Sequence, residues 1–380
     1  MYFLDNASTT SCYEESAKIV ANALVNDYFN PSARYALALE EKNKLDNCRQ
    51  EILKMVGAIN YNCLFTASAT ESNNIVINSC TSKNYISLVS VGEHSSINEI
   101  TKKEVNDGRK VNYLRLDADG LVDFEDFKIK MTKDVGFVSI MLVNNETGAI
   151  NDIKKFVNFA KRINPKVAFH IDAVQAFCKI KINMEDLGAD YLTISSHKVH
   201  GPKGVGALIY RKSAKVSPYI IGGGQENGLR AGTENLPSIL GFVNSAKILS
   251  KNIDENFNTV YKFKLNLVNS LKREAQSNDV NFIINGKLES FSPYILSLSF
   301  PKIRAEILLH KLEEYEIYVG TGSACSSKER GNRILSAMGK NIDIIEGNLR
   351  LSFCVESANY DVDFLAKTII KCVKEIKQKR

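Results

Sequence analysis

Three side chains in this 380-residue sequence have the types and the order that one kind of cofactor chemistry requires. Lys198 follows a polar run, Asp172 ends an apolar run expected to be a strand, and Thr70 stands where a helix is expected to begin. A lysine can bind an aldehyde covalently, a carboxylate can keep a pyridine nitrogen protonated, and a helix start can bind a phosphate. Together they predict a site for pyridoxal 5'-phosphate (PLP), and therefore an enzyme.

Each of these residues also has an ordinary structural interpretation. Lys198 could be a surface lysine, and Lys203 is its rival for the cofactor, although the polar residues before Lys198 favour it. Asp172 and Thr70 could simply cap the helices that follow them. A shared position after predicted strands favours the functional interpretation in each case.

Two more residues fit the same site. His94 follows a predicted strand, and a planar imidazole can stack on a pyridine ring and transfer protons. Gln175, one turn after Asp172, is placed to reach the ring oxygen of the cofactor. A lone histidine or glutamine is more often structural, so only the location of these two residues favours a functional role.

Cys325 differs from the other seven cysteines because small polar residues surround it at 321–327. A thiol in such a loop is exposed and mobile, as a nucleophile must be. Most of the others lie in apolar or helical contexts and are expected to behave as small hydrophobes. No Cys-x-x-Cys pair occurs, so the sequence predicts no metal centre.

Short β-rich runs alternate with helical stretches between about residues 60 and 210. This pattern predicts an α/β fold with a mostly parallel sheet and helices on both faces. The expected strands are 63–65, 85–91, 135–143, 167–171, 191–194 and 205–210. Polar residues follow these strands, and the carboxyl edge of such a sheet is where ligands bind.

A glycine-rich loop at 222–232 precedes a second unit. Helices are expected near 236–250 and 256–276, followed by a small α+β unit with strands 281–284, 295–300, 317–319 and 349–354 and helices 304–314 and 362–377. We therefore predict a large domain at 15–255 and a small domain at 256–380 that includes 1–14, since the length exceeds one ordinary core.

Composition limits the other possibilities. The formal charge of +6 is mild, and no Lys/Arg block is dense enough to predict nucleic-acid binding. No apolar run approaches bilayer length, and the N-terminus lacks a signal-type apolar region. We expect a cytoplasmic protein with mostly free thiols and no membrane partner.

Nearly end to end, the chain resembles the cysteine desulfurases of the NifS/IscS type. These belong to the class V aminotransferase family of fold-type-I PLP enzymes, which have a large and a small domain. The motifs that carry the resemblance are at 4–10, 29–32, 69–74, 93–94, 143–148, 170–175, 195–204, 230–235 and 322–325. Motifs of this number and order are highly specific.

The resemblance implies a role for each site residue. Lys198 would carry PLP, with His94 stacked on the ring. The phosphate would be bound by the helix start at Ala69 and Thr70, by Ser195 and His197, and by Thr233 from the partner subunit of a homodimer. The ring would be held by Asn145, Asp172 and Gln175. Asn30 and Arg350 would bind the substrate carboxylate.

The implied reaction converts L-cysteine to L-alanine, with Cys325 keeping the sulfur as a persulfide. The loop after Cys325 resembles the long form of the NifS/IscS group, which suggests direct transfer to an acceptor for iron–sulfur cluster assembly or for tRNA or cofactor thiolation. Departures from the family pattern occur at 67–68, at Asn227 and at Cys354. The alternatives are a selenocysteine lyase, another class V lyase or transaminase, and a non-catalytic sulfur-relay scaffold.

Overall fold

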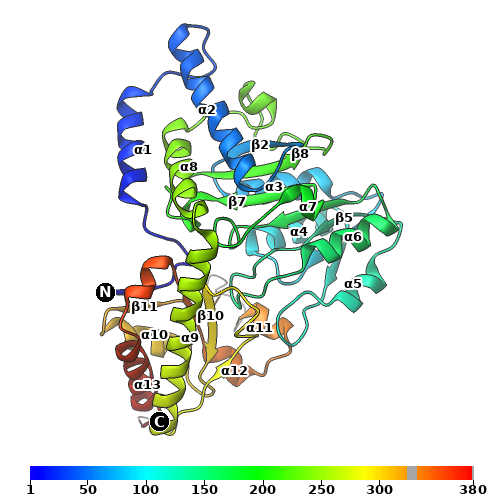
Figure 1. Ribbon diagram of the computed structural model, residues 1–380. Helices are drawn as coiled ribbons and strands as arrows, with labels where there is room; N and C mark the ends of the chain where they lie inside the picture. Colours follow the sequence, from blue (N-terminus) through cyan, green and yellow to red (C-terminus); the bar gives the residue numbers. More distant parts are fainter. Residues whose placement is uncertain (323–331, 379–380) are drawn as a thin grey trace.

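The computed structural model describes residues 1–322 and 332–378, with a large sheet and a smaller one (Figure 1). The large sheet has the strand order β2-β8-β7-β6-β5-β3-β4. Its strands are β2 Tyr61–Thr66, β3 Ile86–Ser90, β4 Lys110–Leu114, β5 Val135–Ser139, β6 Ala168–Asp172, β7 Tyr191–Ser195 and β8 Gly206–Arg211. All pairs from β7 to β4 are parallel, whereas β8 is antiparallel to both β7 and β2. The predicted mostly parallel sheet is confirmed.

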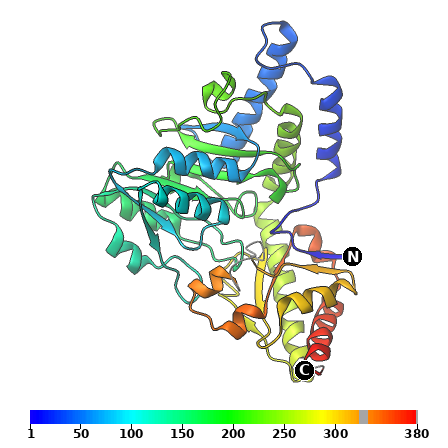
Figure 2. The same cartoon turned by 180° about the vertical axis from the view of Figure 1, so that it is seen from behind.

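Helices cover both faces of this sheet, as predicted. They are α1 Glu14–Asn26, α2 Ala36–Met55, α3 Ala69–Cys80, α4 Ser95–Asn106, α5 Phe124–Lys130, α6 Ile153–Ile163, α7 Met184–Leu187 and α8 Leu236–Ser250, with short 3-10 turns η1 Ser196–Lys198 and η2 Gln225–Gly228. Successive strand residues point to opposite faces. Leu64 therefore belongs to the core beneath α3 and α4, on the face turned toward the viewer in Figure 2, whereas Phe65 belongs to the core on the opposite face, beneath α2, α6 and α8.

The C-terminal part has its own sheet and core. Antiparallel strands are ordered β12-β10-β9, and β1 pairs in parallel with β11. Their bounds are β1 Tyr2–Leu4, β9 Ile283–Ile284, β10 Ile295–Ser299, β11 Ile317–Val319 and β12 Asn348–Ser352. The helices are α9 Ile253–Ser277, α10 Ala305–Glu313, α11 Arg333–Ala337, α12 Ile342–Glu346, η3 Val355–Asn359 and α13 Val362–Gln378. Leu4 joins this core, while the domain boundary at 255 and 256 stays a prediction.

One glycine explains how two distant segments meet at the sheet edge. Gly206, the first residue of β8, is paired with both Ser195 and Thr66. A Cβ atom at Gly206 would lie 2.6 Å from the carbonyl carbon of Ser68 and 2.8 Å from the nitrogen of Ala69. Only glycine leaves room for the start of α3 to pack on β8. The N-terminus of α3 thus lies beside the turn that carries Lys198.

Three details of the strands differ from prediction. Strand β8 runs against its neighbours because a short turn, rather than a crossover helix, joins it to β7. Strand β5 ends at Ser139, although the Ile140 and Leu142 N–H groups still donate to carbonyls of the segment at β6. Strand β4 was not predicted because its side chains are largely exposed at the sheet edge. Among the described helices, none is long and apolar enough to cross a membrane.

Candidate active site at the carboxyl edge of the large sheet

Asp172, the last residue of β6, is buried at this edge. Its Oδ2 accepts a hydrogen bond from Asn73 Nδ2 (2.9 Å), and its Oδ1 accepts one from the Val174 N–H (3.0 Å). The second bond stabilises a turn after β6, whereas the helix that Asp172 would cap in the structural interpretation does not form there. Both donors are neutral, and in the described part of the chain no cation forms an ion pair with Asp172. A buried carboxylate in this state favours a cationic partner such as a pyridinium N–H.

Lys198 ends the η1 turn that directly follows β7. Its Nζ donates to the carbonyl oxygens of Ala7, at 2.7 Å, and of Ser8. Burial and the nearby Arg350 lower the pKa of Lys198 to about 8, while Asp5 and Asp172 act in the opposite direction. A lysine with such a pKa has an appreciable neutral fraction near neutral pH, so it can attack an aldehyde.

The N-terminal segment 7–10 holds several predicted site residues together. Ala7 O also accepts a hydrogen bond from Gln175 Nε2 (2.9 Å), and Thr9 Oγ1 lies 3.1 Å from His197 Nδ1. Gln175 Oε1 in turn accepts from the buried Lys179 Nζ at 3.0 Å. Burial, followed by the charge of Lys198, lowers the pKa of His197 to about 4, so this imidazole is neutral at pH 7.

Sequence reasoning gave no role to Asn73, Lys179 or the segment 7–10. The only signal was that the motifs at 4–10 and 69–74 contain all of them except Lys179. Their contacts join residues far apart along the chain, which spacing alone does not reveal.

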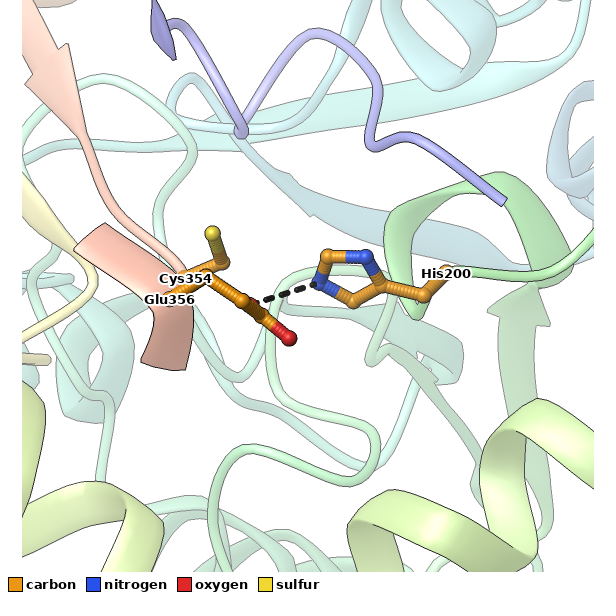
Figure 3. Close-up of side chains that lie close together, drawn as sticks. All are labelled: His200, Cys354 and Glu356. Atoms are coloured by element: carbon orange, nitrogen blue, oxygen red, sulfur yellow. Dashed lines mark ion pairs between the residues drawn. The ribbon is translucent and has the colours of Figure 1, made fainter. Parts of the chain in front are cut away.

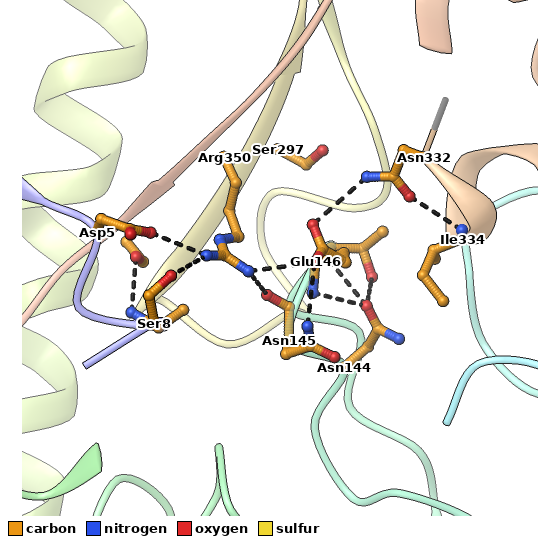
Figure 4. A network of polar contacts seen from close by, with 12 residues as sticks. Asp5, Ser8, Asn144, Asn145, Glu146, Ser297, Asn332, Ile334 and Arg350 are labelled. Carbon is orange, nitrogen blue, oxygen red and sulfur yellow. Dashed lines mark hydrogen bonds and ion pairs between the residues drawn. The ribbon is translucent and has the colours of Figure 1, made fainter. Parts of the chain in front are cut away.

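Arg350 on β12 shares its guanidinium between two carboxylates (Figure 4). Nη2 lies 2.8 Å from Asp5 Oδ1 and 2.6 Å from Ser8 Oγ, and Nη1 lies 3.2 Å from both Glu146 Oε1 and Asn145 O. Burial raises the pKa of Glu146, although Arg350 lowers it. The structure thus brings Arg350 and Asn145 together, and their roles stay predictions. It adds Asp5 and Glu146, which the sequence did not single out.

The start of α3 supplies the candidate phosphate site. Ala69 and Thr70 are its first two residues, and Ser68 Oγ caps it by accepting the Glu71 N–H at 3.2 Å. The alternative in which Thr70 is the cap is therefore wrong. Ser195, buried at the end of β7, reaches the same edge through the pairing described above.

His94 is exposed and precedes α4, where its Nδ1 accepts the Ser96 N–H at 3.2 Å. It is therefore a helix cap, as the structural interpretation expects. Ser96 Oγ also accepts from Asn73 Nδ2 at 2.9 Å, and Asn73 contacts Asp172. Loss of hydration beside the surrounding protein lowers the pKa of His94, while Asp172 acts in the opposite direction. His94 is thus connected to Asp172 through two side chains, and its role in stacking stays a prediction.

Three predicted residues are not placed at this edge by the described contacts. Asn30 is exposed in the loop between α1 and α2, where its Oδ1 accepts the Ser32 N–H at 2.9 Å. Thr233 is exposed in the single chain, in keeping with a residue expected to serve a partner subunit. Cys325 lies outside the described residues.

Comparisons with known proteins give matches along nearly the whole chain. The Aminotransferase class-V family matches residues 2–365. "Cysteine desulfurase IscS" of Dictyoglomus turgidum is 33% identical over 378 residues, which are 97% of this chain and 94% of the relative. A solved NifS-like protein aligns with a TM-score of 0.89 at 30% identity over 100% of both chains. SspA in complex with cysteine aligns with a TM-score of 0.78 at 25% identity, over 93% of this chain and 99% of that one.

The match covers both parts of the fold and every motif at the sheet edge. A relative above 30% identity spans nearly the same length. The chain therefore belongs to the class-V aminotransferase family.

Proposed function

We propose that this protein is a PLP-dependent cysteine desulfurase that forms L-alanine and a persulfide on Cys325. The observation that carries the proposal is the meeting of Lys198, Asp172 and the α3 N-terminus at one sheet edge. The cysteine desulfurase relative and the cysteine-bound SspA structure support cysteine as the substrate. Cys325 favours this reaction over transamination, which needs no thiol.

The residues present fit PLP. Asp172 is a buried carboxylate whose described hydrogen-bond donors are neutral, so it suits the ring N–H. Lys198 would hold the aldehyde carbon, and the N–H groups at the start of α3 would bind the phosphate. When bound, PLP supplies an electron sink for the amino acid.

The protein's own groups would then perform the chemistry around the substrate. Lys198 moves protons at its Nζ, for which a pKa near 8 is suitable. The Cys325 thiolate attacks the sulfur atom of cysteine. The substrate C–S bond breaks, an S–S bond forms on Cys325, and the carbon takes up a proton to leave alanine. Arg350 and Asn30 would orient the substrate carboxylate.

The same proposal predicts the oligomeric state of the enzyme and the fate of the sulfur. Thr233 of a partner subunit would complete the phosphate site, so the active form would be a homodimer. The persulfide would pass to an acceptor protein in the cytoplasm, either an iron–sulfur scaffold or a thiolation enzyme.

The test is peptide mass spectrometry after brief exposure to cysteine. We expect one added sulfur atom on the Cys325 peptide, and borohydride should fix PLP on Lys198. Cys325→Ser should bind PLP but release no sulfide, whereas the control Cys12→Ser should behave like the parent. Sulfur on Cys12 or Cys354, or normal turnover in Cys325→Ser, would refute the proposal.

A further inference from the structure

Three potential metal ligands meet between the two parts of the fold, near but separate from the site described above. His200 follows the η1 turn, two positions after Lys198, whereas Cys354 and Glu356 follow strand β12. Figure 3 shows the imidazole facing the Glu356 carboxylate, with the Cys354 sulfur beside them. One ligand atom from each residue lies within 4.8 Å of the other two. Sequence spacing did not reveal this group because its members come from opposite ends of the fold.

The imidazole of His200 is oriented as a metal ligand would be. Its Nδ1 lies 2.9 Å from the Ser11 carbonyl oxygen, which can only accept, so Nδ1 carries the proton. The lone pair of the neutral ring is then on Nε2, the atom that faces Glu356. The ring is buried and stacked on Tyr13, with centroids 4.4 Å apart and planes at 8°. A backbone carbonyl that fixes the tautomer in this way is usual for metal-bound histidines.

The distance between the His200 and Glu356 ligand atoms helps to distinguish a direct contact from a metal site. His200 Nε2 is 3.9 Å from Glu356 Oε2, which is longer than a hydrogen bond. A nitrogen and an oxygen ligand on one tetrahedral zinc ion, with bonds of about 2.0–2.2 Å, lie about 3.3–3.5 Å apart. The ordinary alternative, an ion pair, would require a second proton on a buried ring. The two atoms are thus too far apart for a hydrogen bond, and a shift of about 0.5 Å in the half-exposed Glu356 side chain would bring them to the separation of two zinc ligands.

We propose that His200 Nε2, Cys354 Sγ and Glu356 Oε2 bind a zinc ion. Nitrogen, sulfur and carboxylate oxygen together are typical of zinc and unlike the all-oxygen sites of calcium or magnesium. The Glu356 side chain is 52% exposed, so water can fill the fourth position. Zinc binds the thiolate, and the Cys354 proton leaves to solvent.

The site would connect the two parts of the chain beside the candidate active site. His200 belongs to the segment that carries Lys198, and Cys354 directly follows the strand that carries Arg350. A zinc ion there would fix the distance between the candidate cofactor lysine and the candidate carboxylate-binding arginine. Its role would be structural, because none of its three ligands is a predicted catalytic residue.

The test is zinc titration by calorimetry on the full-length protein with PLP bound, after dialysis against EDTA. All samples carry Cys325→Ser so that this second candidate thiol cannot bind the metal. We expect one zinc ion per chain, and binding weaker by about tenfold or more in both Cys354→Ser and Glu356→Gln. Glu356 is half-exposed, so its variant should fold. Cys12→Ser is the control for a nearby exposed thiol and should bind zinc normally.

X-ray absorption at the zinc edge gives a readout that needs no further variant. We expect one sulfur neighbour at about 2.3 Å and nitrogen or oxygen neighbours at about 2.0 Å. Zinc that binds equally well after Cys354→Ser and Glu356→Gln, a first shell without sulfur, or no binding at micromolar zinc would overturn the proposal.

Discussion

Lys198 should destabilise the folded protein when no cofactor is bound, and Lys198→Met should relieve this cost. A lysine whose pKa falls from 10.5 to about 8 on folding costs about 3 kcal/mol at pH 7. Methionine keeps most of the volume but loses the hydrogen bonds to Ala7 O and Ser8 O, worth about 1 kcal/mol each. The variant apoprotein should therefore be more stable than the wild type by about 1 kcal/mol at pH 7.

The pH dependence is the stronger test. Between pH 8 and 10.5 the unfolded chain binds more protons at this lysine than the folded one, so wild-type stability rises with pH. The stability of Lys198→Met relative to wild type should fall by about 2 kcal/mol between pH 7 and pH 9.5, so that the variant becomes the less stable protein by about 1 kcal/mol. Urea unfolding of the two apoproteins, at several pH values, measures this difference directly.

Lys203→Met is the matched control, because Lys203 is exposed only five positions later. Its stability relative to wild type should not change over the same pH range. If the difference between Lys198→Met and wild type varies by less than about 0.5 kcal/mol from pH 7 to 9.5, Lys198 has an ordinary pKa and the reasoning fails.

Three other substitutions test the site. Arg350→Ala leaves the Asp5 and Glu146 carboxylates without their shared guanidinium, so urea unfolding should show a loss of about 3–5 kcal/mol; a loss below about 1 kcal/mol would contradict the network. Asp172→Asn keeps the shape but removes the charge, so sulfide release from cysteine should fall by about a hundredfold or more, and unchanged turnover would exclude the proposed role. Thr233→Ala should weaken PLP binding in a fluorescence titration by about tenfold while light scattering still shows a dimer; a fully active monomer would contradict the shared site.

Much of the fold could be predicted because short apolar strand segments alternate with helical segments along the sequence. Apolar runs followed by polar residues located β2, β3, β6 and β7, and these are the strands whose ends carry Asp172, Ser195 and the α3 start. The direction of β8 could not be predicted in the same way. A buried strand has the same apolar pattern in either direction, and the short turn after Lys198 decides it.

The sequence predicted the residues of the site more completely than the contacts between them. Lys198 and Asp172 were recognisable because both lie at the carboxyl ends of predicted strands, where α/β sheets bind ligands. Ala7, by contrast, contributes only its carbonyl oxygen, which any residue could supply. Ser68 rather than Thr70 caps α3, because the helix begins at Ala69, two residues before the start that a cap at Thr70 would require.

The position of Arg350 at the site does not by itself determine which carboxylates it can bind. One guanidinium cannot neutralise Asp5, Glu146 and an incoming substrate carboxylate together, since three negative charges would face one positive charge. Burial already raises the pKa of Glu146, so its protonation costs less than that of an exposed carboxyl group. Asp5 accepts from the same guanidinium but belongs to the N-terminal segment that also contacts Lys198 through Ala7 and Ser8. Substrate binding at Arg350 therefore requires either a proton on Glu146 or a shift of Asp5, and the second would move the carbonyl groups that hold the lysine.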